Sequence, residues 1–393
     1  MSRYLGAEKV GIYYLALTVT NIAIVVSMVG LNNSLVKYSA QSFANHDWKT
    51  LVEIHNGSIA IVAITSFIAM LLIIVLAPWL AGNIFHKQAL CNPLRYVAIT
   101  IIPINLVAIY VSIFKGLKKI ISATVAESLY TSLFMILLLI AFREILSVSI
   151  VGMLLLAATG TNLIIARAVW HKTASSQGVN KKRIAVNKKL LQTSWPLYAV
   201  ALMNMVMSMS DVVMLGLWKD SHVIGIYGVA VRITSVSSMF LVIVNTIVAP
   251  RFSILYDRGD HESLSNIARF STLFMVVIAA FFLILFISIP DFILYLFGEE
   301  FVSGKNIVII LAVGQFVVLS TGPVAALLMM TGNEIFHRNT TIFSAALNIA
   351  LNYMLIPVYG GVGAAFATAF SLSLKNILAV MHVRKRLRIR VLI

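Results

Sequence analysis

The sequence is short of charge and of cysteine. Only 11% of its 393 residues are charged while 60% are hydrophobic, and the mean hydropathy is +0.96. A soluble domain of this length cannot bury so much apolar surface, whereas repeated runs of ~20 apolar residues match a bilayer core of ~30 Å. The single cysteine, Cys91, excludes an intrachain disulfide and a cysteine-cluster metal site. These shortages predict an integral membrane protein.

Catalytic motifs are also absent. The sequence has no Gly-rich phosphate loop ending in Lys-Ser/Thr, no HExxH and no nucleophile elbow, and its eight histidines lack a short paired spacing. A membrane polymerase or glycosyltransferase would need a large outer loop with catalytic groups, but the longest loops on that side, about 81–96 and 290–306, are short. We therefore expect neither an enzyme nor a cofactor.

Eleven apolar spans follow one another along the chain, which predicts an all-α integral membrane fold. A polar linker, 171–193, separates an N-terminal lobe of five spans (1–170) from a C-terminal lobe of six (194–393). Gly11-Ile12-Tyr13 and Ala16 match Gly225-Ile226-Tyr227 and Ala230 at a constant offset, which indicates an internal repeat. The expected spans are 10–30, 59–80, 97–114, 123–142, 147–170, 194–217, 223–249, 270–289, 307–330, 340–358 and 361–383.

Basic residues outnumber acidic ones by 30 to 14, giving a net charge of +16. They gather in one alternate set of loops, which includes the linker 171–193 and the terminus 384–390. Such a bias predicts that these loops and the C-terminus are cytoplasmic, and it favours contact with anionic lipid over nucleic acid. With an odd number of spans, the N-terminus is expected outside.

A complete span precedes Gly225, but only ten residues precede Gly11. The first lobe is therefore expected to lack its opening helix. We expect a 5 + 6 arrangement derived from 6 + 6, through either a late start codon or a genuinely shortened protein.

Charged residues inside apolar spans are expensive and usually mark a pathway. Asp211 and Arg232 flank one short outer loop, each ~10–15 Å deep. Arg232 is expected to hold an anionic headgroup, and Asp211 to couple a proton or sodium ion or to gate the site. Alternatively, the two form a salt bridge that only fixes helix packing.

Three further charges are candidates for the same pathway. Lys375 lies too deep to reach water easily; Arg167 lies near a span end, where snorkelling is the simpler interpretation; and Glu127 either lines the pathway or pairs with Lys119. The mid-span asparagines are expected to form interhelical hydrogen bonds, namely Asn21, Asn105 and Asn204.

Three segments carry a family resemblance: 5–40, 210–233 and 331–368. The second places Asp211 and Arg232 at its acidic and basic positions, and the third ends an Asn-rich helix in Leu-Ile-Pro-x-Tyr-Gly. In this order they resemble polysaccharide flippases, the O-antigen and polysaccharide exporters of the multidrug/oligosaccharidyl-lipid/polysaccharide superfamily.

The resemblance implies a MATE-like transporter of two six-helix lobes with a cationic central cavity, here without the first helix. It implies alternating access that moves an undecaprenyl-diphosphate-linked oligosaccharide across the plasma (inner) membrane of a prokaryote, alongside membrane lipids and polysaccharide polymerase or assembly proteins. The alternatives are a cation-coupled multidrug exporter, a lipid II flippase and an inactive truncated transporter.

Overall fold

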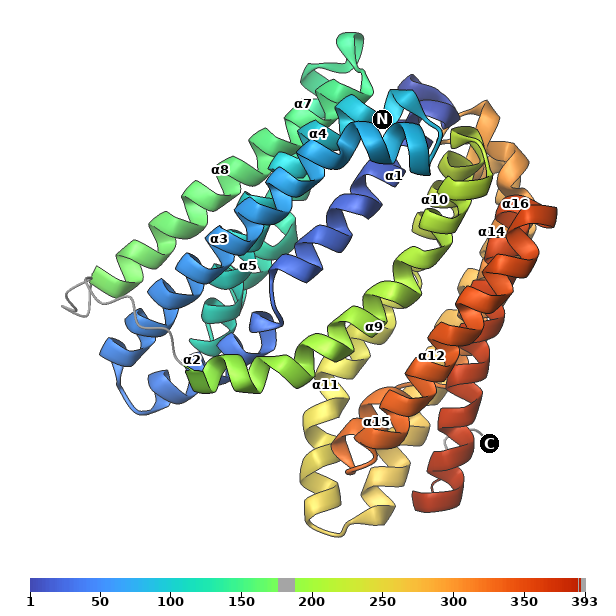
Figure 1. The fold of residues 1–393 in the computed structure, drawn as a ribbon. Helices are drawn as coiled ribbons and strands as arrows, with labels where there is room; N and C mark the ends of the chain where they lie inside the picture. The colour runs from blue at the N-terminus through green and yellow to red at the C-terminus, as the bar shows by residue number, and fades with distance from the viewer. Residues whose placement is uncertain (176–187, 388, 390–393) are drawn as a thin grey trace. The chain divides into compact units, whose positions relative to one another are not determined.

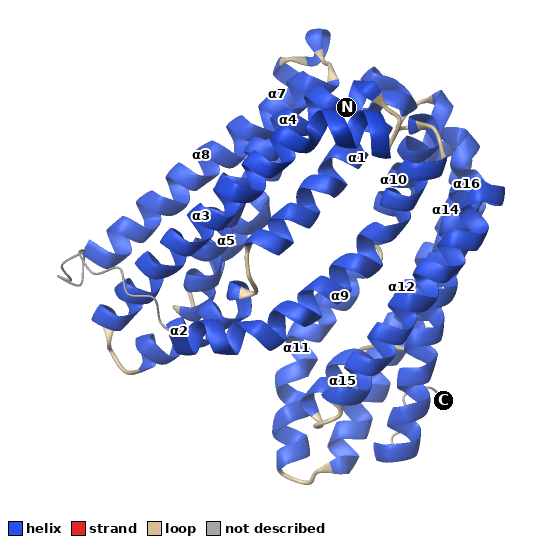
Figure 2. Ribbon diagram, in the orientation of Figure 1, coloured by secondary structure: helices blue, strands red, loops and turns tan. Residues whose placement is uncertain are grey.

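The computed structural model describes residues 1–175, 188–387 and 389, and this part of the chain is helical with connecting loops (Figure 2). Its contacts divide it into two compact units. Unit 1 contains Ile12–Met205 with Met1 and Arg3–Leu5, and unit 2 contains Val206–Ile393 with Ser2 and Gly6–Gly11. The predicted linker lies partly outside the described residues, so its place as the boundary between two lobes stays a prediction.

Helices in unit 1 follow the order of the predicted spans (Figure 1). Short π turns (η1, η3) and 3-10 turns (η2, η4) interrupt or connect them. In chain order they are α1 (Ser2–Ser27), α2 (Leu31–Ala44), α3 (Trp48–Trp79), η1 (Leu80–Ile84), η2 (Gln88–Leu90), α4 (Cys91–Ile99), α5 (Ile101–Gly116), α6 (Ile120–Thr124), η3 (Val125–Leu129), α7 (Tyr130–Ala141), η4 (Arg143–Ile145) and α8 (Val148–Ser175).

Helix α9 (Lys188–Trp218) begins in unit 1 and ends in unit 2. Unit 2 continues with α10 (Ser221–Ser235), α11 (Ser238–Asp257), α12 (His261–Ser288), α13 (Pro290–Tyr295), η5 (Glu299–Gly304), α14 (Lys305–Ser320), α15 (Val324–Met330) and α16 (Glu334–Leu387).

The helix lengths agree with the eleven predicted spans. Nine segments of the described chain are long and apolar enough to cross a membrane, and Leu202–Trp218 is a shorter apolar helix. One of the nine, α16, has 54 residues, which is more than twice the length that spans a bilayer core. Gly360 breaks α16 with φ 56° and ψ −131°, and Figure 1 shows that α16 turns back on itself. The two arms of α16 therefore count as two spans.

Helix α3 illustrates how the composition is distributed. Phe67, Leu71 and Val75 are at least half exposed, and their spacing places them on one face of the helix. Ser66 and Ile73, on the opposite face, are buried. The exposed face of α3 is apolar, while its buried face combines apolar side chains with small polar ones, as expected where lipid is the solvent.

One of the predicted asparagine contacts is confirmed in unit 1. Asn105 of α5 is buried, and its Nδ2 donates hydrogen bonds to Ser27 Oγ at 2.8 Å and to Ser66 Oγ at 2.9 Å. These bonds join α5 to α1 and α3. Asn105 therefore acts as an interhelical hydrogen-bonding residue.

The repeated glycines meet within unit 2. A Cβ added to Gly11 would overlap the backbone of Ser221, and one added to Gly225 would overlap the backbone of Ala7. The two contacts are equivalent under the repeat, because Ala7 and Ser221 each lie four residues before their glycine. Close approach of two backbones explains why the first residue of each Gly-Ile-Tyr is glycine.

Helix α2 was not among the predicted spans. It contains only 14 residues, and its N-cap, Gly30, adopts the left-handed φ of 70°. Polar residues interrupt its apolar pattern, so no membrane-length run marks it. The apolar pattern therefore predicts a loop where the chain forms a short helix.

Candidate functional site

Asp211 is the centre of a buried polar cluster in unit 2. It lies two turns before the end of α9 and is only 5% exposed. Tyr227 of α10 donates its hydroxyl to Oδ2 at 2.5 Å, and Thr368 of α16 donates to the same oxygen. Asn352 Nδ2 donates to Oδ1 at 2.6 Å. Helices α9, α10 and both arms of α16 thus meet at one carboxylate.

The kink in α16 makes this cluster possible. Asn352 and Thr368 lie the same number of residues before and after Gly360, so the returning arm brings them to the same depth. Asn348, one turn before Asn352, extends the network: its Oδ1 accepts from Ser210 Oγ at 2.7 Å and from Asn352 Nδ2 at 3.0 Å.

Oxygen atoms outnumber nitrogen atoms among the hydrogen-bonding groups of this cluster. Asp211, Thr368, Tyr227 and Asn348 each direct oxygen toward it, and Asn352 Oδ1 is buried without a hydrogen-bond partner in the described structure. A buried acceptor without a donor is unfavourable by about 1–3 kcal/mol. Hard monovalent cations prefer such oxygen ligands. Whether the cluster takes up a proton or a sodium ion stays a prediction.

The predicted partner of Asp211 is not in the cluster. Arg232 lies on an exposed part of α10 and is not among the hydrogen-bond or ion-pair partners of Asp211 in the described chain. The structure therefore gives no support to the Asp211–Arg232 salt bridge weighed as an alternative.

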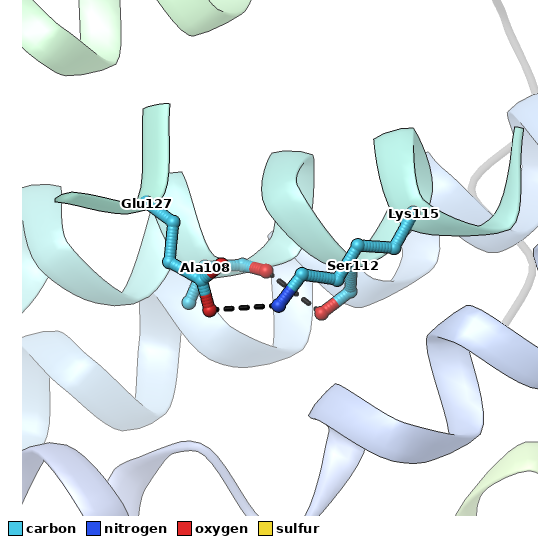
Figure 3. Close-up of polar contacts among 4 residues, drawn as sticks. All are labelled: Ala108, Ser112, Lys115 and Glu127. Carbon is cyan, nitrogen blue, oxygen red and sulfur yellow. Dashed lines mark hydrogen bonds and ion pairs between the residues drawn. The ribbon is translucent and has the colours of Figure 1, made fainter. Parts of the chain in front are cut away.

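A second polar site lies in unit 1, at the end of α5. Lys115 Nζ contacts Glu127 Oε1 at 2.7 Å, with the two side chains 43% and 50% exposed. Figure 3 shows the pair beside Ser112, whose Oγ donates to Ala108 O at 2.9 Å. They line a cavity of about 580 Å³ together with hydroxyl and amide side chains, among them Thr131 and Asn162. The cavity presents donors and acceptors on its walls, as a polar ligand requires.

The position of Glu127 follows from a local irregularity. It lies in η3, a π turn between α6 and α7, and such turns displace backbone carbonyls from the regular ladder. Asn162 of α8 donates to Ala126 O at 2.7 Å and to Thr131 Oγ1 at 2.9 Å, which fixes this turn against α8.

The expected pairing of Glu127 with Lys119 is wrong. Lys118 adopts a φ of 56°, and this turn directs Lys119 toward α8, where its Nζ donates to Thr173 Oγ1 at 2.8 Å. Lys115, on the last turn of α5, is the residue that reaches Glu127.

The two remaining predicted residues lie apart from these clusters. Arg167, on α8, is exposed and lines a separate cavity with His55 and Trp170. Lys375, in the second arm of α16, is partly buried and lies within electrostatic range of His337. In the described chain, no hydrogen-bonded cluster unites any two of Asp211, Arg232, Lys375, Arg167 and Glu127.

Sequence comparison places the chain in a family. The family described as "Polysaccharide biosynthesis protein" matches residues 1–255, and a second, described as MatE, matches residues 196–354. Because the first match covers more than half of the chain, the protein belongs to the polysaccharide biosynthesis protein family.

Two relatives from Haloferax volcanii are similar to the chain. "Probable low-salt glycan biosynthesis flippase Agl15" is 24% identical over 390 residues, which cover 96% of this chain and 77% of the relative. "Probable flippase AglR" is 30% identical over 201 residues, which cover 49% of this chain and 41% of the relative.

Solved structures confirm the MATE-like fold. An inward-facing multidrug resistance transporter of the MATE family superposes with a TM-score of 0.71 at 13% identity, covering 98% of this chain and 96% of that one. The lipid II flippase MurJ, in an inward closed conformation, gives a TM-score of 0.70 at 14% identity and covers 98% and 83%.

Proposed function

We propose that the protein flips a polyprenyl-diphosphate-linked oligosaccharide, a building unit of a surface glycan, across the cytoplasmic membrane by alternating access. The observation that carries this proposal is the similarity to a glycan biosynthesis flippase along 96% of the chain. The membrane is the plasma membrane of a prokaryote, with the C-terminus on the cytoplasmic side, where the basic loops lie.

Asp211 is the cation site in this proposal. Its carboxylate is buried, accepts hydrogen bonds from Tyr227, Thr368 and Asn352, and has no basic partner in the described chain, so a proton or a sodium ion would neutralise a buried charge. Occupancy would change the charge at the junction of α9, α10 and α16. Such a change in charge shifts the balance between two conformations of these helices.

The basic residues Arg232, Lys375 and Arg167 contribute positive charge for the diphosphate, since guanidinium and ammonium groups bind phosphate oxygens through charge-assisted hydrogen bonds. The cavity beside Lys115 and Glu127 offers hydroxyl, amide and charged groups to the glycan. Transport of this kind breaks no bond, so the protein is a transporter rather than an enzyme, working beside the polymerase and assembly proteins that use its product.

The MatE match and the MATE structures favour a second candidate, a cation-coupled multidrug exporter. Acidic groups would suit cationic drugs. Arg232 and Lys375 instead outnumber the one buried acid among these residues, which favours an anionic substrate.

Complementation of a flippase-null strain tests the proposal, with surface glycan as the readout and membrane expression as the control. The chain should restore glycan, and Arg232→Ala should reduce it without loss of protein. Arg338→Ala, a change to an exposed base beside Asn339, should leave export unchanged. If the Arg232→Ala variant exports glycan normally at a normal expression level, Arg232 is not part of the transport pathway.

A further inference from the structure

A separate cavity of about 400 Å³ lies in unit 1 between α3, α5 and α8. Its polar lining includes His55, Asn56, Arg167 and His171, and its apolar lining includes Leu106 and Leu163. None of the described residues that line it is acidic. The cavity therefore combines positive charge and hydrogen-bonding groups with apolar walls.

His55 is fixed in this cavity by two aromatic rings. Its imidazole stacks on Trp170, with ring centroids 4.4 Å apart and planes at 27°, and Tyr110 lies 5.3 Å away. The residue is only 6% exposed. Packing on two sides holds the ring in one orientation, which suits a binding site more than a mobile surface.

The hydrogen bonding of His55 is incomplete. Its Nδ1 lies 2.9 Å from Asn56 Oδ1, an acceptor, so Nδ1 carries the hydrogen and Nε2 presents its lone pair. Nε2 is buried and has no hydrogen-bond partner in the described structure. Buried polar atoms are almost always satisfied. A donor from a ligand in the cavity, such as a hydroxyl, would complete the bonding.

The depth of the cavity suits a lipid. His55 lies roughly two turns, or ~11 Å, from the start of α3, and Arg167 lies roughly two turns from the end of α8. These two helix ends carry Lys49 and Lys172 and belong to the side that the charge bias predicts to be cytoplasmic. The lining therefore lies near the boundary between headgroups and acyl chains.

We propose that this cavity binds a phosphorylated lipid whose headgroup carries a hydroxyl group. The phosphate lies on the guanidinium of Arg167, which matches phosphate oxygens in a bidentate fork. The headgroup hydroxyl donates to His55 Nε2, and the hydrocarbon chain follows Leu106 and Leu163. Two lipids share this chemistry: a resident phospholipid such as phosphatidylglycerol, and a polyprenyl-phosphate-linked sugar.

Native mass spectrometry of the purified full-length chain tests this site. Phosphatidylglycerol, polyprenyl phosphate mannose and phosphatidylcholine are titrated separately, the last because its headgroup has no hydroxyl. At least one of the first two should bind more tightly than phosphatidylcholine. Loss of a charge-assisted bond in Arg167→Gln should weaken that binding by about tenfold or more, and His55→Phe, which keeps the ring stack, should weaken it by a few-fold.

Lys172→Gln is the matched control, because Lys172 is an exposed base on the same helix and does not line the cavity. Tighter binding of phosphatidylglycerol identifies a resident phospholipid, and tighter binding of the polyprenyl lipid identifies a carrier. Equal binding of phosphatidylcholine, or unchanged binding by Arg167→Gln, overturns the proposal. Arg167 is exposed, so its variant decides the matter even where His55→Phe fails to fold. The titration involves no export assay, so its failure would remove Arg167 from phosphate binding, while the flipping activity itself is tested separately by complementation.

Discussion

Asp211→Asn removes the negative charge of the buried cluster and keeps the shape of the side chain. The amide is nearly the same size as the carboxylate, so helix packing around it stays intact. If its oxygen faces Tyr227 and Thr368, both hydroxyls keep an acceptor. Its NH₂ then faces Asn352, whose own Oδ1 has no partner and can turn to accept from it.

The free-energy change can be estimated from these bonds. Three hydrogen bonds to a charged group become neutral ones, a loss of roughly 1 kcal/mol each at most, and Asn352 gives up one neutral bond to Asn348. Asp211→Ala instead leaves the donors of Tyr227, Thr368 and Asn352 unpaired, and each buried unpaired group costs about 1–3 kcal/mol. The alanine variant should therefore be the less stable of the two.

Two measurements on the purified variants test this reasoning. Thermal unfolding should show Asp211→Asn moderately below wild type and Asp211→Ala further below it. Sodium or acid should stabilise the wild type, since a ligand at 100 times its Kd adds about 2.7 kcal/mol. Neither should stabilise Asp211→Asn, and its export should be lost. If Asp211→Asn exports glycan normally and is still stabilised by sodium or acid, the cation role of Asp211 is refuted. If Asp211→Asn and Asp211→Ala are destabilised equally, the carboxylate only supports packing.

Three further predictions concern the rest of the chain. A double-mutant cycle of Lys115→Gln and Glu127→Gln, measured by thermal unfolding, should give a coupling free energy of only about 0.2–1 kcal/mol, because both side chains are about half exposed. A much larger coupling free energy would contradict this exposure. Gly11→Ala should destabilise the protein by about 1–3 kcal/mol through overlap with Ser221, whereas Gly160→Ala, which meets nothing within 4 Å, should be neutral or slightly stabilising; equal melting temperatures would refute the close crossing. Asp47 caps α3 by accepting a hydrogen bond from Thr50 N–H at 3.0 Å, and the hydrogen bonds from Thr50 lower the pKa of Asp47. Because the pKa is lower in the folded protein, Asp47→Ala should lower the free energy of unfolding by about 1 kcal/mol at neutral pH, and this difference should shrink as the pH falls below about 4. A difference that does not depend on pH would contradict the cap.

Most of the fold could be predicted from the sequence. Apolar runs of membrane length set the spans, and the small residues after Leu-Ile-Pro-x-Tyr separated the last two at the point where Gly360 breaks α16. Helix α2 could not be predicted in this way, because a 14-residue helix with mixed polarity has no bilayer-length signature.

The candidate site was predicted only in part. Asp211 stood out because an acid in an apolar run is expensive, and Asn348 and Asn352, one turn apart, carried a detectable signal. Tyr227 and Thr368 did not, since tyrosine and threonine are common in membrane helices and only the kink at Gly360 brings Thr368 to the carboxylate. Glu127 was paired with the wrong lysine because spacing along the chain cannot show the turn at Lys118.

Reconstituted flipping is the most direct test of the proposed function. The purified chain in liposomes, loaded with a polyprenyl-diphosphate-linked oligosaccharide, should expose inner-leaflet glycan to an added lectin at a rate that rises with a sodium or proton gradient. Asp211→Asn liposomes with the same amount of protein should match protein-free liposomes. Glycan exposure at the protein-free rate by the wild type, under either gradient, would contradict the assignment of this chain as a lipid-linked oligosaccharide flippase.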